Sequence, residues 1–320
     1  MKRCEVVVTG VGMITPWGTT AETSAEGWSA RRAVGRRALE DLRDTSLAGA
    51  QVATLPEFDA AQRLGERRML KFMSDAAVIG CVAAREASTQ AGLKGRFRPE
   101  RVGLYAGAGL AAASVKDSYP IIRESIDAEG RFSCRLLGSR GLASTNPLLS
   151  FKILANMPAC LVSILESVKG PNYIFTPWEG QTASALEEAW NAVADGEVDC
   201  ALAGAADYPT HPSTYVFLRQ SGLLCEGEFP AAAAAYLALE RRETAARDNR
   251  PILAEIGEMS VVECNDGPHD PLSALMGRSF AAAPAVLLAL ASRTEVASVF
   301  VSGVDGQAFH AEVRRPRCNA

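Results

Sequence analysis

The sequence predicts an α/β fold, and two observations support this prediction. Short, almost continuously apolar runs alternate along the chain with longer alanine-rich segments of helical spacing, which is typical of strands buried between layers of helices. Hydrophobic residues make up 48% of the 320 residues, which is enough to bury one large core or two fused halves. No tandem repeat of short period is visible.

The first third of the chain begins with a β-branched run at residues 5–9, expected as a strand that ends before Gly10 and the turn formers that follow. A short helix is expected at 23–30, and the charged stretch 31–50 has no clear period. Residues 71–92 carry apolar side chains at helical spacing, and Gly92 fits the helix C-cap.

The middle of the chain continues the alternation. Residues 106–109 form a small-residue loop, and 111–140 predict an excursion with helical pieces and no strong strand. The expected strands are 101–105, 173–176 and 200–204. The expected helices are 148–155, 158–169 and 181–195, the second of them stopped by Gly170-Pro171.

The last quarter predicts more strands and one long helix. Residues 231–239 favour a strand, although their alanine content fits a helix equally well. Residues 252–262 predict a further strand, and 273–292 a helix. Residues 296–301 and 307–313 are expected to form a closing hairpin.

Composition argues against several classes of protein. The net charge is -4 without blocks of like charge, so nucleic acid and anionic membranes are poor candidates for partners. No run of 18 apolar residues predicts a membrane span, and the start lacks the apolar core of a signal peptide, so a cytoplasmic protein is expected. Eight cysteines without a CxxC pair indicate reduced thiols, with neither a zinc site nor another cofactor.

Several motifs then point to a family. Residues 6–18 read VVVTGVGMITPWG, 101–109 read RVGLYAGAG, and Gly170-Pro171-Asn172 precedes an alanine-rich segment at 183–207. Together these resemble the β-ketoacyl synthases over roughly residues 5–260. The resemblance implies a thiolase-like layered fold (α-β-α-β-α) with a shortened C-terminal half. We expect an N-terminal ketosynthase-like half at 1–250, with an interface excursion at about 106–170, and a truncated half at 251–320.

The resemblance also implies that the catalytic residues are missing. The family's nucleophilic cysteine falls at Glu179, which follows the bulky Trp178, expected to plug the pocket. One family histidine falls at Arg278, and the other has no counterpart. We expect the positive end of the helix dipole to lower the pKa of the Glu179 carboxyl group. As a purely structural residue, Glu179 would simply complement the helix dipole.

The function implied is that of a chain-length-factor-like subunit of type II polyketide, aryl-polyene or fatty-acid-like biosynthesis. It would pair with an active ketosynthase in a heterodimer or larger assembly and meet the acyl carrier protein only indirectly. The candidate channel and interface residues are Val115, Tyr119, Asn156 and Met157. Two alternatives stay open: a malonyl-carrier decarboxylase that uses Glu179, and a scaffold or regulatory pseudoenzyme.

Overall fold

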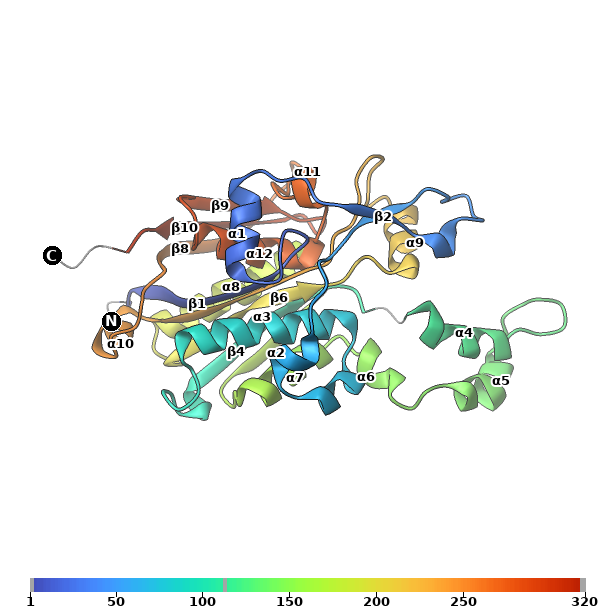
Figure 1. Cartoon of the computed structure of the whole chain (residues 1–320), viewed down its shortest axis with the longest axis horizontal. Coiled ribbons are helices and arrows are strands. Elements are labelled where there is room, and N and C mark those ends of the chain that lie inside the picture. The colour runs from blue at the N-terminus through green and yellow to red at the C-terminus, as the bar shows by residue number, and fades with distance from the viewer. Residues whose placement is uncertain (1–2, 112–113, 317–320) are drawn as a thin grey trace.

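A computed structural model describes residues 3–111 and 114–316. Their main feature is one mixed, eight-stranded sheet in the order β5-β4-β6-β7-β1-β8-β10-β9, beside a two-stranded hairpin of β2 and β3 (Figure 1). The strands are β1 Val6–Ile14, β2 Arg36–Ala38, β3 Gln51–Ala53, β4 Val102–Ala108, β5 Asn172–Phe175, β6 Cys200–Asp207, β7 Ala233–Arg241, β8 Ala254–Glu263, β9 Ser298–Ser302 and β10 Gln307–Arg314. Strand β4 pairs in parallel with β5 and β6, and the remaining pairs in this sheet are antiparallel.

The helices lie in layers around this sheet. They are α1 Ala21–Ser29, α2 Ala60–Leu64, α3 Asp75–Ala91, α4 Val115–Glu124, α5 Cys134–Leu136, α6 Leu149–Ile153, α7 Met157–Glu166, α8 Glu179–Ala194, α9 Pro212–Gln220, α10 Arg242–Arg247, α11 Ser273–Met276 and α12 Ala283–Ala291. Helices α3 and α7 pack together against one face. Helices α8 and α12 pack on the other face, and β8, β10 and β9 also contact them, so this pair of helices is enclosed by strands.

Small residues allow the helices to approach the sheet closely. A Cβ added at Gly12 of β1 would lie 2.0 Å from the Ala83 carbonyl oxygen of α3. A Cβ added at Gly107 of β4 would lie 1.9 Å from the Thr182 hydroxyl of α8. Only glycine fits at these two positions, because real Cβ atoms do not approach so near. The first turns of α8 are thereby held against the carboxyl ends of the parallel strands.

Most of the predicted elements are confirmed. Helix α3 starts only at Asp75 because the Ser74 side chain caps it, and it ends at Gly92 in the left-handed conformation, as expected. The alanine-rich segment 231–239 forms most of β7, a central strand. The helix expected over 273–292 was wrong: the chain turns at Gly277, with φ of 91°, and the main helix starts at Ala283.

The C-terminal part of the chain adds three strands to the sheet. Strands β8, β10 and β9 join the same sheet as the earlier strands, so the division at residue 250 stays a prediction. Phe300 and Val262 remain exposed on the side of these strands that faces away from α8 and α12. None of the described helices is long and apolar enough to cross a membrane.

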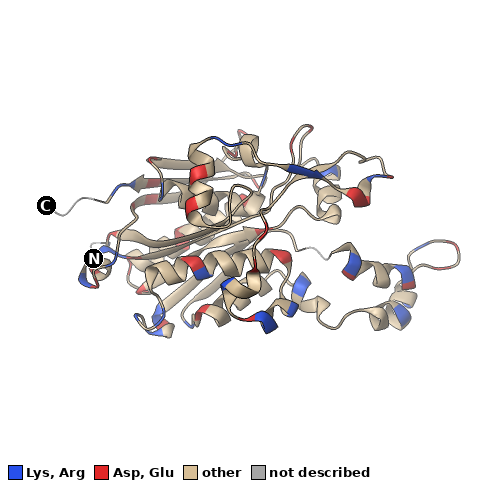
Figure 2. Ribbon diagram, in the orientation of Figure 1, with Lys and Arg blue, Asp and Glu red and all other residues tan. Residues whose placement is uncertain are grey.

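One segment stands apart from the body. Helices α4 and α5 extend to one side in Figure 1, within the excursion that the sequence predicts, whereas α6 packs on α7. Helix α4 buries none of its residues in this chain. Basic and acidic residues are interspersed over the rest of the molecule (Figure 2).

Candidate functional site: a buried glutamate–arginine pair

The candidate site lies at the first turn of α8. Strand β5 leads through a short turn to Trp178, which takes the N-cap position, and Glu179 is the first helical residue. Its side chain is only 1% exposed. Because β4, β5 and β6 run in parallel, their carboxyl ends meet at this edge, where α/β proteins commonly place functional groups.

The partner of Glu179 comes from a segment 99 residues later in the sequence. Arg278 follows the turn at Gly277, and its backbone forms hydrogen bonds with Phe229 and Ala231 beside β7. Its Nη2 atom donates to the Glu179 Oε1 atom at 3.0 Å, and its side chain is 4% exposed. The two residues predicted from the sequence to stand at the family's cysteine and histidine positions therefore form a buried ion pair.

Aromatic side chains surround this pair. The Trp178 and Phe280 ring centroids lie 6.1 Å apart, and the Arg278 guanidinium stands 4.7 Å from the Phe280 ring. Phe280 is held at a φ of 37°, a conformation unusual for an aromatic residue. The contact of Trp178 with Phe280 agrees with the interpretation of Trp178 as a plug, which stays a proposal.

The electrostatics of Glu179 differ from the expectation. Burial raises the pKa of its carboxyl group, while Arg278 and backbone N–H groups act in the opposite direction. The Val304 N–H donates to Oε2 at 3.3 Å. The lowered pKa expected from the helix N-terminus was therefore wrong, because desolvation outweighs the dipole at this depth.

Two further acids that sequence reasoning missed lie in the same region. Burial raises the pKa of Asp207, at the end of β6, well above its usual range, and raises that of Asp270 to about 7. The negative charge of Glu179 contributes to both shifts. Asp207 accepts a hydrogen bond from the Ala281 N–H at 3.2 Å, and the Leu272 N–H donates to Asp270 at 2.9 Å. Only the fold brings these acids near Glu179.

The turn between β9 and β10 covers the start of α8, next to Glu179. Asp305 accepts a hydrogen bond from the Gly180 N–H at 3.3 Å. A Cβ added at Gly180 would lie 2.4 Å from Gln307 Oε1, so this turn sits directly on the start of α8. The Glu179 carboxylate is thus occupied by Arg278 and by backbone donors, an arrangement suited to holding a charge in place.

The predicted channel and interface residues lie elsewhere. Val115 and Tyr119 are exposed on α4, and both line an open cavity of about 660 Å³ together with Tyr208 and His211. Asn156 occupies the N-cap of α7 and Met157 is its first residue. The described contacts do not bring these four predicted residues to Glu179, and their roles stay predictions.

The comparisons with known proteins assign the chain to a family. Residues 3–236 match the model of the β-ketoacyl synthase N-terminal domain, and the chain belongs to this family. It is 29% identical over 211 residues to nodulation protein E of Rhizobium meliloti, covering 64% of this chain and 47% of the relative. It is 26% identical to the oxytetracycline polyketide putative β-ketoacyl synthase 1 of Streptomyces rimosus, covering 65% and 47%.

The solved structures confirm the fold. The ishigamide ketosynthase/chain length factor superposes with a TM-score of 0.76 at 17% identity, covering 98% of this chain and 100% of that chain. The thiolase-like ketosynthase fold predicted from the sequence is therefore confirmed. The chain spans about half the length of the curated relatives it matches.

Proposed function

We propose that this chain is a non-catalytic subunit that pairs with an active ketosynthase, as a chain length factor does, in type II polyketide or fatty-acid-like biosynthesis. The observation that carries this proposal is the Glu179–Arg278 pair. A carboxylate neutralised by an arginine is a poor acyl-transfer nucleophile, and an acyl anhydride at that position would be open to hydrolysis. The condensation chemistry would then come from the partner.

The uncovered face of α4 supports a partner subunit. Val115, Tyr119 and Ile122 follow one another at helical spacing, and their exposed fractions are 41%, 57% and 51%. Apolar residues grouped on one face of a helix that buries nothing in its own chain are typical of an interface. We propose that the ketosynthase covers this face, and that the acyl carrier protein reaches the pair through that active subunit.

The cavity beside α4 supports a role in shaping the acyl channel. Tyr119 forms part of its wall, and the cavity is open on this chain alone. A ketosynthase seated on α4 would close it. Asp207 and Tyr208 line a narrow neighbouring cavity of about 20 Å³ on the side of the buried pair, room for about one water molecule. The smaller cavity is too narrow to admit an acyl chain from the side of the buried pair. An acyl chain in the larger cavity would therefore enter from the partner subunit.

The test is reconstitution with an intact ketosynthase of a type II system, sought first among the genes that neighbour the gene for this chain. We expect the two proteins to co-purify as a complex, and the complex to yield a defined product that the ketosynthase alone does not make. The same complex carrying a cysteine-to-alanine change in the ketosynthase should make no product. An acyl group covalently attached to this chain after incubation with an acyl-carrier donor would contradict the proposal.

The same purified proteins distinguish this proposal from its two alternatives, a decarboxylase and a scaffold. A malonyl-carrier decarboxylase would release carbon dioxide when this chain is incubated alone, and Glu179→Ala combined with Arg278→Met would abolish that release without leaving an unpaired buried charge. A scaffold would improve the solubility of the ketosynthase and leave the product profile unchanged.

A further inference from the structure

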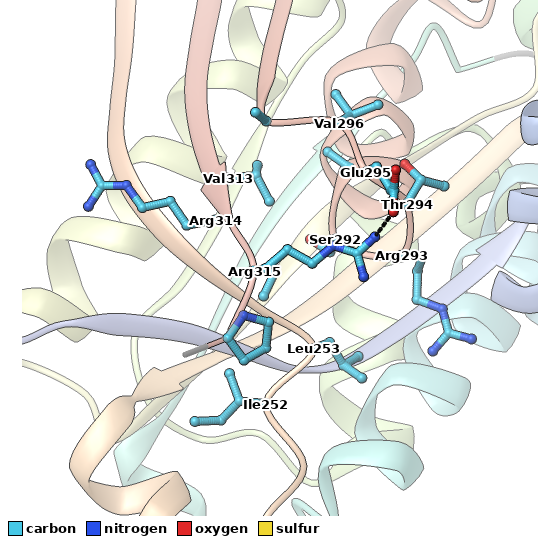
Figure 3. A pocket seen from close by; sticks show the side chains of 14 residues that line it. Ile252, Leu253, Ser292, Arg293, Thr294, Glu295, Val296, Val313, Arg314 and Arg315 are labelled. Atoms are coloured by element: carbon cyan, nitrogen blue, oxygen red, sulfur yellow. Dashed lines mark hydrogen bonds and ion pairs between the residues drawn. The ribbon is translucent and has the colours of Figure 1, made fainter. Parts of the chain in front are cut away.

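A separate groove lies far from α4, at the end of α12. It has a volume of about 530 Å³ and is formed by the start of β8, the residues after α12 and the end of β10 (Figure 3). This volume falls in the range typical of small-molecule sites. Its wall is largely apolar, with Ile252, Leu253, Val296, Val313 and Pro316.

Three arginines provide the polar part of this groove. Arg293, Arg314 and Arg315 all line it, and Glu295 is the only acidic residue among its lining residues. Arg314 is paired with Glu312 at 2.6 Å. No ion pair or hydrogen bond of the Arg293 side chain is found among the described residues, although its positive charge also acts on Glu86. The local charge is therefore positive above an apolar wall.

The Arg315–Glu295 pair bridges two sides of the groove. Arg315 Nη2 lies 3.1 Å from Glu295 Oε1, and the side chains are 68% and 91% exposed. In Figure 3 this is the dashed contact between the end of β10 and the residues after α12. Such exposed pairs contribute little stability, so Arg315 can exchange Glu295 for another carboxylate at low cost.

Two side-chain hydroxyl groups bind the carbonyl end of α12 beside the groove. Helix C-termini carry partial negative charge on their free carbonyl groups. The Ser292 hydroxyl donates to the Leu288 carbonyl and the Thr294 hydroxyl to the Leu290 carbonyl, each at 2.8 Å. These hydrogen bonds satisfy carbonyl groups of the last turn, and the arginines determine the charge at the groove.

We propose that this groove binds a small anionic amphiphile, a carboxylate on a medium-length apolar chain. The carboxylate pairs with Arg315 in place of Glu295, Arg293 adds a second positive charge, and the apolar chain lies along Leu253, Val296 and Val313. The groove is separate from the buried pair and from α4, so this proposal does not depend on the proposed function.

The test is calorimetric titration of the full chain with decanoate. We expect saturable binding, at least about tenfold tighter than that of decanol, which lacks the charge, or of acetate, which lacks the chain. Arg315→Gln should weaken binding about tenfold. Glu295→Gln should strengthen it severalfold, because the competing carboxylate is removed.

Matched variants keep the proposal falsifiable. Val296→Trp should abolish binding by filling the groove without changing the charge. Arg140→Gln, an exposed arginine on the excursion, should leave binding unchanged. Circular dichroism of each variant checks folding. The proposal would be overturned if decanol bound as tightly as decanoate, or if neither Arg315→Gln nor Val296→Trp changed binding. Binding of an acidic decapeptide but not of decanoate would also overturn it.

Discussion

Arg278 Nη2 lies 3.0 Å from Glu179 Oε1, and both side chains are almost completely buried. Two charges taken out of water are stable only together, because each would otherwise lose its hydration without compensation. The pair therefore makes the first turn of α8 depend on the turn that precedes α12.

Removing one partner should be costly. We expect Glu179→Gln to lower the free energy of unfolding by about 3 kcal/mol, because the buried Arg278 keeps its charge and retains only the more distant Glu228, at 3.8 Å, as an ionic partner. The double variant Glu179→Gln with Arg278→Met should recover most of this loss. Urea denaturation measures both. The control is Arg123→Gln, which breaks an exposed ion pair with Glu124 and should cost no more than about 0.5 kcal/mol. A Glu179→Gln protein as stable as the parent would contradict this account.

Asp270 predicts a pH dependence of stability. Its pKa is raised to about 7 in the fold, whereas an unfolded aspartate titrates near 3.9, so the folded state binds the proton more tightly. This contribution is complete below about pH 4 and is lost as the pH rises toward 7. We expect urea midpoints to fall between about pH 4 and 7, and Asp270→Asn to flatten the profile. Asp266→Asn, in an exposed loop, is the control. A parent profile parallel to that of Asp270→Asn would exclude this role.

Asp207 should behave as a neutral group at pH 7. Burial raises its pKa well above the usual range, so the protonated form resembles an asparagine amide in charge and shape. We expect Asp207→Asn to change the free energy of unfolding by less than about 1 kcal/mol, since the Ala281 N–H keeps an acceptor. Asp207→Ala should cost about 2 to 3 kcal/mol, because that donor is left unpaired in the core. Thermal unfolding of both variants distinguishes these outcomes; a large loss in Asp207→Asn would mean that the charge is required.

Tyr119 predicts an effect on product size in the reconstituted complex. Its side chain lines the cavity beside α4, so Tyr119→Ala should enlarge the channel and shift the product toward longer chains, measured by mass spectrometry. Ile122→Ala is the matched control, since this residue is similarly exposed on the same helix and does not line that cavity. Unchanged product length in Tyr119→Ala, with the complex intact, would reject the role of this residue.

The sequence was sufficient for the elements whose signals are local. Gly92 ends α3 as predicted because its left-handed conformation is a property of one residue. The apolar run at 200–204 predicts a strand because both faces of a central strand are buried. The alanine-rich run at 231–239 fits a helix equally well, and only its place between β6 and β1 decides for the strand.

The remaining features depend on tertiary contacts. The break within 273–292 was missed because that segment has good helical composition, while the fold needs a turn at Gly277 to bring Arg278 to Glu179. The direction of the Glu179 pKa shift was wrong because dipole effects can be read from helix position, whereas burial cannot. Asp207 and Asp270 were missed for the same reason.

The place of β1 in the sheet has a consequence for the folding of the protein during translation. This strand is synthesised before the other strands of its sheet, yet its two neighbours are β7, Ala233–Arg241, and β8, Ala254–Glu263. It must wait unpaired while residues 15–232 are translated, a period during which an apolar strand is open to aggregation. Nascent chains of this protein should therefore depend on chaperones until β7 has emerged.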